Sequence, residues 1–93
     1  MTEQTKITQS CLIVNKQGLH TRSAAAIVQL ANQFPCTITL STEKGESEAS
    51  DMLRLMLLEA TLDSEIFVSA IGDKAAEAVQ AMLDFIRAGF DEI

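Results

Sequence analysis

The sequence predicts an α+β fold, a two-layer sandwich in which three helices cover one face of a four-stranded, mostly antiparallel sheet. The first observation is the order of the periodic segments, β-α-β-β-α-β-α. The second is the strict alternation and β-branched bias of residues 36–41, which is typical of a half-buried strand. The third is the helical spacing of apolar residues after Ala24 and again after Ala75. Elements with one apolar face each are expected to bury those faces against one another.

The first half of the chain is predicted to form a strand, a turn, a helix and a second strand. Residues 6–14 end in an apolar run and are interpreted as the first strand. Residues 15–18, Asn-Lys-Gln-Gly, are a turn signal. The helical spacing that starts at Ala24 continues through Phe34 until Pro35 stops it, and residues 36–41 follow as a strand.

A hairpin and a short helix are predicted next. Residues 43–46 form the hairpin turn, and a short polar strand follows through about Ala49. Ser50 and Asp51 are expected to cap a helix over residues 52–58, and the Ser50 hydroxyl is the favoured cap. The alternative for Ser50 is a shifted phosphorylation site.

The last strand is predicted over residues 66–71, and the last helix follows it. Residues 72–73, Gly-Asp, are expected to break the strand and cap the helix. The helix carries apolar residues at helical spacing from Ala75 onward, and Gly89 is expected to end it. Residues 89–93 are expected to fray.

Composition and charge exclude several classes of protein. The 93 residues predict a single domain over 1–93, and 47% hydrophobic with 22% charged residues is a globular composition. A net charge of -6, with no Trp or Tyr, argues against nucleic-acid binding. Residues 1–35 carry three basic side chains and one acidic side chain, whereas residues 36–93 carry four basic and twelve acidic side chains. The single histidine, His20, therefore lies in the only positive part of the chain, which chance would also explain.

The N-terminal segment and the cysteines predict a cytoplasmic protein. No apolar stretch follows the polar first six residues, and none approaches the ~20 residues that a membrane helix needs. Cys11 and Cys36 are expected to be reduced, buried thiols rather than a disulfide. One histidine and two cysteines predict no metal site, and we expect no cofactor.

Residues 18–23, Gly-Leu-His-Thr-Arg-Ser, join the first strand to the first helix and carry the chemistry. A helix N-terminus binds anions through its unpaired N–H groups and its dipole. Thr21, Arg22 and Ser23 would supply those N–H groups, and the Arg22 guanidinium matches a phosphate. A neutral imidazole at His20 would be the nucleophile, which indicates a histidine phosphocarrier. The alternative is an exposed loop histidine without a role. Other catalytic chemistry is disfavoured, because no hydrolytic triad or nucleotide-binding motif is present.

The second helix is apolar on nearly all sides and predicts a protein-binding surface. Met52, Leu55 and Leu58 are expected to face the sheet. An exposed apolar patch usually marks an interaction site, and Met suits a surface that must fit several partners. The remaining apolar residues are predicted to be exposed, unless all of them belong to the core: Leu53, Met56 and Leu57.

The segment Gly18-Leu19-His20-Thr21-Arg22, followed by Ala24-Ala25, closely resembles the active-site motif of the HPr family. These proteins are the histidine phosphocarriers of the bacterial phosphoenolpyruvate phosphotransferase system. The resemblance covers nearly the whole chain and implies the family's open-faced sandwich. Residues 89–92 and the acidic charge are most similar to the nitrogen-related branch, NPr.

The resemblance implies a place in a phosphoryl relay. His20 would be phosphorylated on Nδ1 by an Enzyme I-type protein, ultimately from phosphoenolpyruvate, and would pass the group to a IIA-type acceptor. Arg22 would balance the phosphate charge. A carrier of this kind is expected to be monomeric and to turn over no small molecule alone. The resemblance implies a partner-binding surface that consists of Thr21, Ala25, Met52, Leu53, Arg54, Met56 and Leu57.

Two positions depart from the family pattern. Ser23 replaces the usual proline; serine restores a donor but is expected to loosen the backbone. Asp51 stands where many members have a regulatory serine, which removes the usual target of HPr kinase.

Two other functions remain open: a regulatory module that binds a target through the second helix while His20 is silent, and a small-molecule sensor of ACT-like topology.

Overall fold

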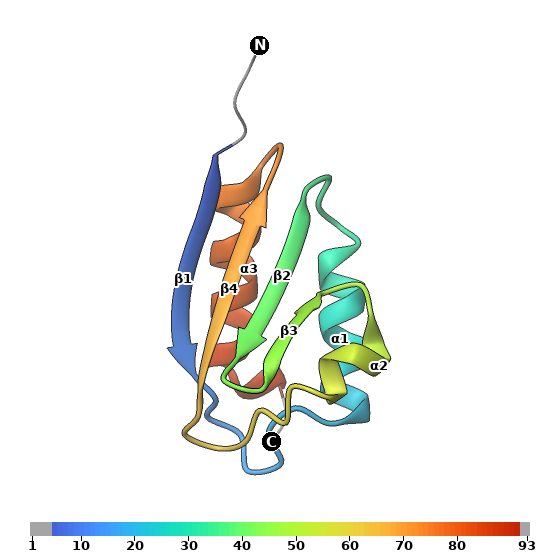
Figure 1. Ribbon diagram of the computed structural model, residues 1–93, viewed down its shortest axis with the longest axis vertical. Coiled ribbons are helices and arrows are strands. Elements are labelled where there is room, and N and C mark those ends of the chain that lie inside the picture. Colours follow the sequence, from blue (N-terminus) through green and yellow to red (C-terminus); the bar gives the residue numbers. More distant parts are fainter. Residues whose placement is uncertain (1–4, 92–93) are drawn as a thin grey trace.

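A computed structural model describes residues 5–91 and contains one four-stranded sheet with the strand order β1-β4-β2-β3 (Figure 1). All three strand pairings are antiparallel. The central strands β4 and β2 bring together segments about thirty residues apart, so the sheet depends on long-range pairing. The strands are β1 (Lys6–Leu12), β2 (Thr37–Thr42), β3 (Gly45–Glu48) and β4 (Glu65–Ile71).

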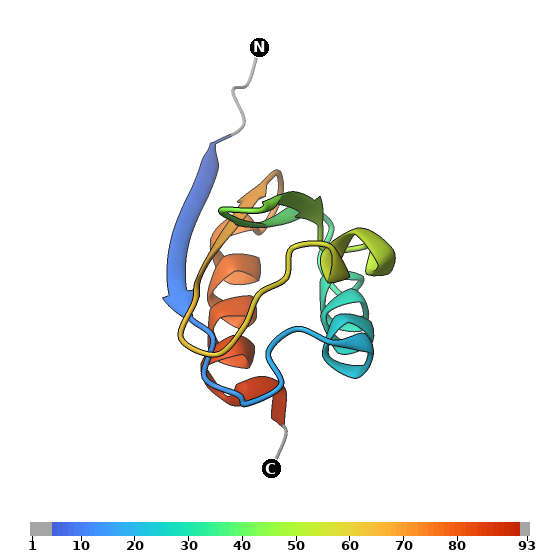
Figure 2. The same cartoon turned by 60° about the horizontal axis from the view of Figure 1, so that its bottom comes forward.

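Three α-helices lie on one side of the sheet, and the other face is open (Figure 2). They are α1 (Thr21–Ala31), α2 (Met52–Met56) and α3 (Ala75–Arg87), and a 3₁₀ turn, η1 (Gly89–Asp91), follows. α3 packs beneath β1 and β4, while the short α2 lies beside α1 near β3 (Figure 2). The predicted open-faced α+β sandwich is confirmed. No helix in the described part of the chain is long and apolar enough to span a membrane.

The core lies between the sheet and the helices. Each apolar side chain removed from water contributes roughly 1.5–3 kcal/mol before entropy is considered, so this layer is the main source of stability. Because α1 contributes its inner face to this layer, the start of α1 is fixed relative to the sheet. The largest fully buried side chains include Ile13, Ile27, Leu40, Leu55, Ile66, Val68, Met82, Leu83 and Ile86.

The boundaries in the first half differ from the sequence prediction at three places. β1 ends at Leu12 rather than at residue 14, because the bond from the Ile13 N–H to the Ser64 carbonyl (2.9 Å) is not returned: the Ser64 N–H donates to the Thr61 carbonyl (3.0 Å) instead. α1 begins at Thr21, one turn before the periodic apolar residues. It ends at Ala31 rather than at Phe34, whose N–H closes a tighter turn on the Ala31 carbonyl (3.2 Å).

The helix caps of the second half also require correction. Asp51, not Ser50, caps α2, because the Asp51 carboxylate accepts from the Arg54 N–H (3.1 Å). The predicted cap is therefore confirmed for Asp51 and wrong for Ser50, and α2 ends at Met56 rather than at residue 58. α3 starts after Lys74, which has left-handed backbone angles and makes no side-chain cap, so the prediction of a cap by residues 72–73 is also wrong.

The C-terminal turn η1, which ends at Asp91, is packed against the rest of the fold and does not fray. Phe90 is 5% exposed, and its ring meets Phe85 edge-on with centroids 5.5 Å apart. Such an aromatic pair adds about 0.5–1.5 kcal/mol beyond area burial. The expectation of fraying is wrong for residues 89–91, and Glu92 and Ile93 lie outside the described residues.

Both cysteines are free and half-buried, which corrects the expectation of fully buried thiols. Cys11 and Cys36 nevertheless pack against the core. Burial raises the pKa of the Cys11 thiol, and the positive charge of Arg87 opposes this rise only in part. The raised pKa disfavours the thiolate, which is the nucleophilic form of Cys11.

Candidate functional site

His20 is the N-cap residue of α1. Its backbone is extended (φ -135°, ψ -175°), and its carbonyl accepts the first intrahelical bond, from the Ala24 N–H (2.8 Å). The imidazole is half-buried, whereas Thr21 and Arg22 beside it are exposed. The structure thus places His20, Thr21 and Arg22 together at the N-terminus of α1, where the helix dipole favours an anion.

Gly18 allows the chain to approach the segment after α2 closely. Its φ is +63°, and an added Cβ would lie 2.3 Å from the Ala60 carbonyl oxygen and 2.9 Å from the Thr61 Cα. The neighbouring Leu19 N–H donates to the same Ala60 oxygen (2.8 Å). Any side chain at position 18 would therefore push the loop before His20 away from its support.

Asn15 holds the same loop from inside the fold, and sequence reasoning assigned it no role beyond the turn. It is 9% exposed, and its Nδ2 donates to the Gly18 carbonyl (2.9 Å). The Gly18 N–H in turn donates to the Asn15 carbonyl (3.2 Å). An Asn three residues before a Gly in a turn was the available signal, because Asn side chains often bond to backbone groups nearby.

Ser23 closes the loop from the helix side. It is 1% exposed, and its Oγ accepts from the His20 N–H (2.8 Å). The hydroxyl also lies within donor distance of the Gly18 carbonyl (3.2 Å) and the His20 carbonyl (3.1 Å). The expected loosening of the backbone by serine is therefore wrong in this structure. Burial keeps this hydroxyl away from a bound phosphate, so a phosphate contact of Ser23 is left to its backbone.

The predicted apolar surface of α2 lies next to the histidine. Leu53 is 78% exposed, Leu57 72% and Met56 36%. α1 and α2 pack together, and the Thr21 Oγ1 contacts the Met56 Sδ at 3.9 Å. The exposure of these three apolar residues is confirmed. Their surface is continuous with the residue that follows His20.

The other predicted partner-binding residues have mixed environments. Ala25 is half-buried on α1, and Met52 is half-buried because it packs against the core. Leu55 and Leu58 are buried as predicted. Arg54 is exposed, and its Nε donates to the Glu46 carbonyl (3.2 Å), which directs its guanidinium toward β3.

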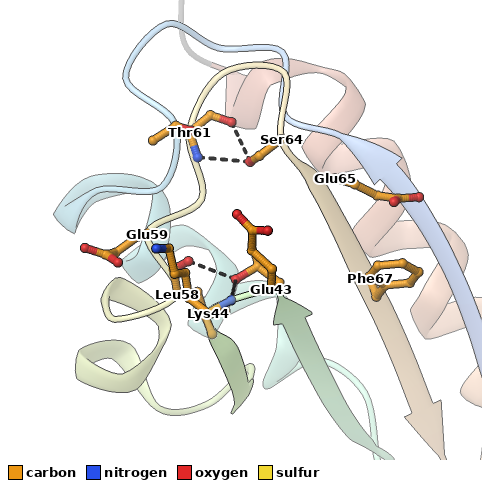
Figure 3. Close-up of a pocket in the computed structure, with 9 residues that line it drawn as sticks. Glu43, Lys44, Leu58, Glu59, Thr61, Ser64, Glu65 and Phe67 are labelled. Atoms are coloured by element: carbon orange, nitrogen blue, oxygen red, sulfur yellow. Dashed lines mark hydrogen bonds between the residues drawn. The ribbon is translucent and has the colours of Figure 1, made fainter.

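A groove of about 550 Å³ lies elsewhere, between the β2–β3 turn and residues 58–65 (Figure 3). Phe67 from the open face of the sheet and the carboxylates of Glu43 and Glu65 line it. His20 is not among its lining residues, so the imidazole is presented on the surface rather than inside this groove. Among residues 5–91, no group of His, Cys, Asp and Glu side chains is arranged to hold a metal ion.

An open-faced sandwich with a half-buried histidine at the start of its first helix is the arrangement expected of a class, the histidine phosphocarriers. The profile described as "PTS HPr component phosphorylation site" matches residues 7–88, and the chain belongs to this HPr family. The ACT-like alternative is therefore wrong. Among the relatives, the phosphocarrier protein NPr of Escherichia coli K12 is 32% identical over 87 residues, which cover 92% of this chain and 97% of that protein.

Solved structures agree with this assignment. HPr-C-His from Thermoanaerobacter tengcongensis superimposes with a TM-score of 0.86 at 32% identity, over 94% of this chain and 98% of that one. An HPr dimer from the same organism gives a TM-score of 0.72 at 34% identity, over 99% and 100% of the two chains. The relatives thus share the fold along the whole described chain.

Proposed function

We propose that His20 accepts a phosphoryl group from a phosphorylated Enzyme I-type protein and passes it to a IIA-type acceptor. One observation carries this assignment within the family: the half-buried imidazole at the N-terminus of α1, with the exposed Arg22 two residues away. The chain would act as a carrier in a relay that starts from phosphoenolpyruvate. It would turn over no small molecule alone.

The transfer needs only an exchange of one bond for another. An imidazole nitrogen of His20 attacks phosphorus, the bond from phosphorus to the donor's nitrogen breaks, and the donor's ring leaves with the electron pair. The acceptor later attacks the same phosphorus and displaces the His20 ring in the same way. No oxidant, reductant or metal ligand enters this balance.

The charge that arrives with the phosphoryl group determines which residues assist. The N–H groups of residues 21–23 and the dipole of α1 would stabilise an anion at His20 by about 0.3–1 kcal/mol. A charge-assisted hydrogen bond from the Arg22 guanidinium would add roughly 1.5–3 kcal/mol. Because the helix N-terminus and Arg22 both stabilise the phosphorylated form, they favour uptake of the phosphoryl group and oppose its release.

The exposed surface of α2 fits a protein donor and a protein acceptor rather than a small substrate. Leu53 and Leu57 are mostly exposed, and Met56 contacts Thr21 beside the histidine. A partner that covers this patch would bring its own phosphorylated side chain to His20. The same surface would serve both partners in turn, since only one can occupy it at a time.

The similarity to NPr supports a place in the nitrogen-related branch. We propose that the chain acts in the cytoplasm as one domain over residues 1–93. The monomeric state stays a prediction, and the HPr dimer among the similar structures makes a sedimentation measurement worthwhile.

Intact-mass spectrometry tests the proposal. The protein is incubated with phosphoenolpyruvate and an Enzyme I-type protein, and His20→Ala serves as the matched control. We expect one acid-labile phosphoryl group on the native chain, none on the variant, and loss of the group when a IIA-type acceptor is added. An unchanged native mass would instead favour the regulatory module that binds through α2 without phosphorylation.

A further inference from the structure

We propose that the Ser23 hydroxyl is a positioning group that fixes the direction of the His20 imidazole before a donor arrives. The inference rests on the proposed function, since it concerns the rate at which His20 reacts. The side chain would act through the backbone and would not touch the phosphoryl group.

We call the hydrogen bonds of the Ser23 hydroxyl the clamp. In the clamp, the hydroxyl acts both as an acceptor and as a donor. Ser23 Oγ accepts from the His20 N–H at 2.8 Å. Its single proton has two carbonyl oxygens within reach, that of Gly18 at 3.2 Å and that of His20 at 3.1 Å. Ser23 is 1% exposed, so water cannot readily replace these bonds. The hydroxyl therefore ties the segment from Gly18 to His20 to the first turn of α1.

The direction of the imidazole depends on this tie because His20 is a cap residue. Its carbonyl belongs to the helix, but its N–H lies outside the helical hydrogen-bond pattern. The Ser23 hydroxyl binds that N–H, and the Ser23 backbone N–H donates in return to the His20 side chain, so the two residues form a capping box that orients the imidazole. Small errors in the position of a reacting atom have large effects on rate.

Ser64 provides a matched control within the same protein. Its Oγ accepts from the Thr61 N–H at 3.0 Å and donates to the Thr61 carbonyl at 2.6 Å (Figure 3). This is the same arrangement over three residues, but it lies in the loop after α2. Ser64→Ala therefore removes the same type of hydrogen bonds while leaving in place those that residues 18–20 make themselves, including the bond from the Leu19 N–H to the Ala60 carbonyl.

The experiment combines hydrogen exchange with transfer kinetics on Ser23→Ala, Ser23→Cys, Ser23→Thr and Ser64→Ala. Exchange at the His20 amide is followed by NMR on the unphosphorylated proteins, and transfer is measured at saturating Enzyme I-type donor. We expect Ser23→Ala to lose protection at His20 and to transfer about fivefold to tenfold more slowly, with an unchanged KM for the donor. Ser64→Ala is expected to match the native protein in both measurements.

Across the three Ser23 variants, the saturated rate is expected to follow His20 protection rather than the urea midpoint. Native exchange at His20 in Ser23→Ala, or lost protection with a native rate, would overturn the inference. If Ser23→Ala does not fold, the Cys and Thr variants still decide it by the same comparison. If the native protein takes no phosphoryl group, the proposed function fails, while exchange at His20 separately reports whether the clamp exists.

Discussion

Replacing Gly18 by alanine is expected to destabilise the protein by about 2–4 kcal/mol. The left-handed backbone at φ +63° costs a non-glycine residue about 1 kcal/mol. The new Cβ would also lie 2.3 Å from the Ala60 carbonyl oxygen, and relieving such an overlap typically costs about 1–3 kcal/mol. Relief would move the backbone that carries Leu19 and His20, so transfer is expected to slow more than stability alone explains.

Gly89→Ala isolates the contribution of the backbone angle. Gly89 has φ +68°, but an added Cβ would meet only the Asn15 Cβ at 3.7 Å and the Val14 Cγ2 at 3.8 Å, which is ordinary contact. Urea denaturation of both variants gives the difference that belongs to the close approach at Ala60. If the two variants lose the same free energy within about 0.5 kcal/mol, the backbone contact contributes nothing and the reasoning fails.

Three further perturbations test separate parts of the account. Leu53→Glu is expected to slow transfer from the donor while changing stability by no more than ~0.5 kcal/mol, because the side chain is 78% exposed; urea titration showing a much larger loss would place it in the core. Asp51→Ala is expected to cost ~0.5–2 kcal/mol by removing the cap of α2, whereas Ser50→Ala should cost almost nothing in the same assay, and equal losses would contradict the assignment. In a Cys36→Ser chain, iodoacetamide is expected to modify Cys11 more slowly in the native than in the urea-unfolded state. The raised pKa keeps the thiol protonated, so the native rate should climb only at a higher pH than that of the unfolded chain; coincident pH profiles would refute this.

The fold was predictable where the apolar period was long and clear. The pattern over residues 36–41 and the helical spacing from Ala75 located β2 and α3 to within a residue or two. Boundaries failed where a tertiary hydrogen bond decided them. β1 stops at Leu12 because the Ser64 N–H turns to the Thr61 carbonyl and does not bond to Ile13, and no signal near residue 13 reports a change about fifty residues away.

The place of the candidate site was predictable, but its support was not. The position of His20 and Arg22 at the start of α1 and the exposure of the apolar residues of α2 followed from residue type and spacing. The contact between Gly18 and Ala60 was not, because it joins two loops that are distant in sequence. Ser23 was assigned the opposite effect, since propensity alone does not show that its hydroxyl is buried against the His20 N–H.

The central claim is that His20 carries the phosphoryl group, and its location on the native protein tests this most directly. The protein is labelled with ¹⁵N at histidine and charged with phosphoenolpyruvate and an Enzyme I-type protein. The two ring nitrogens of His20 are then observed by NMR. The account predicts that one ring nitrogen, Nδ1 by the family resemblance, shows coupling to phosphorus in the same fraction of molecules that gains mass. A phosphorylated protein whose His20 ring spectrum is unchanged would contradict it.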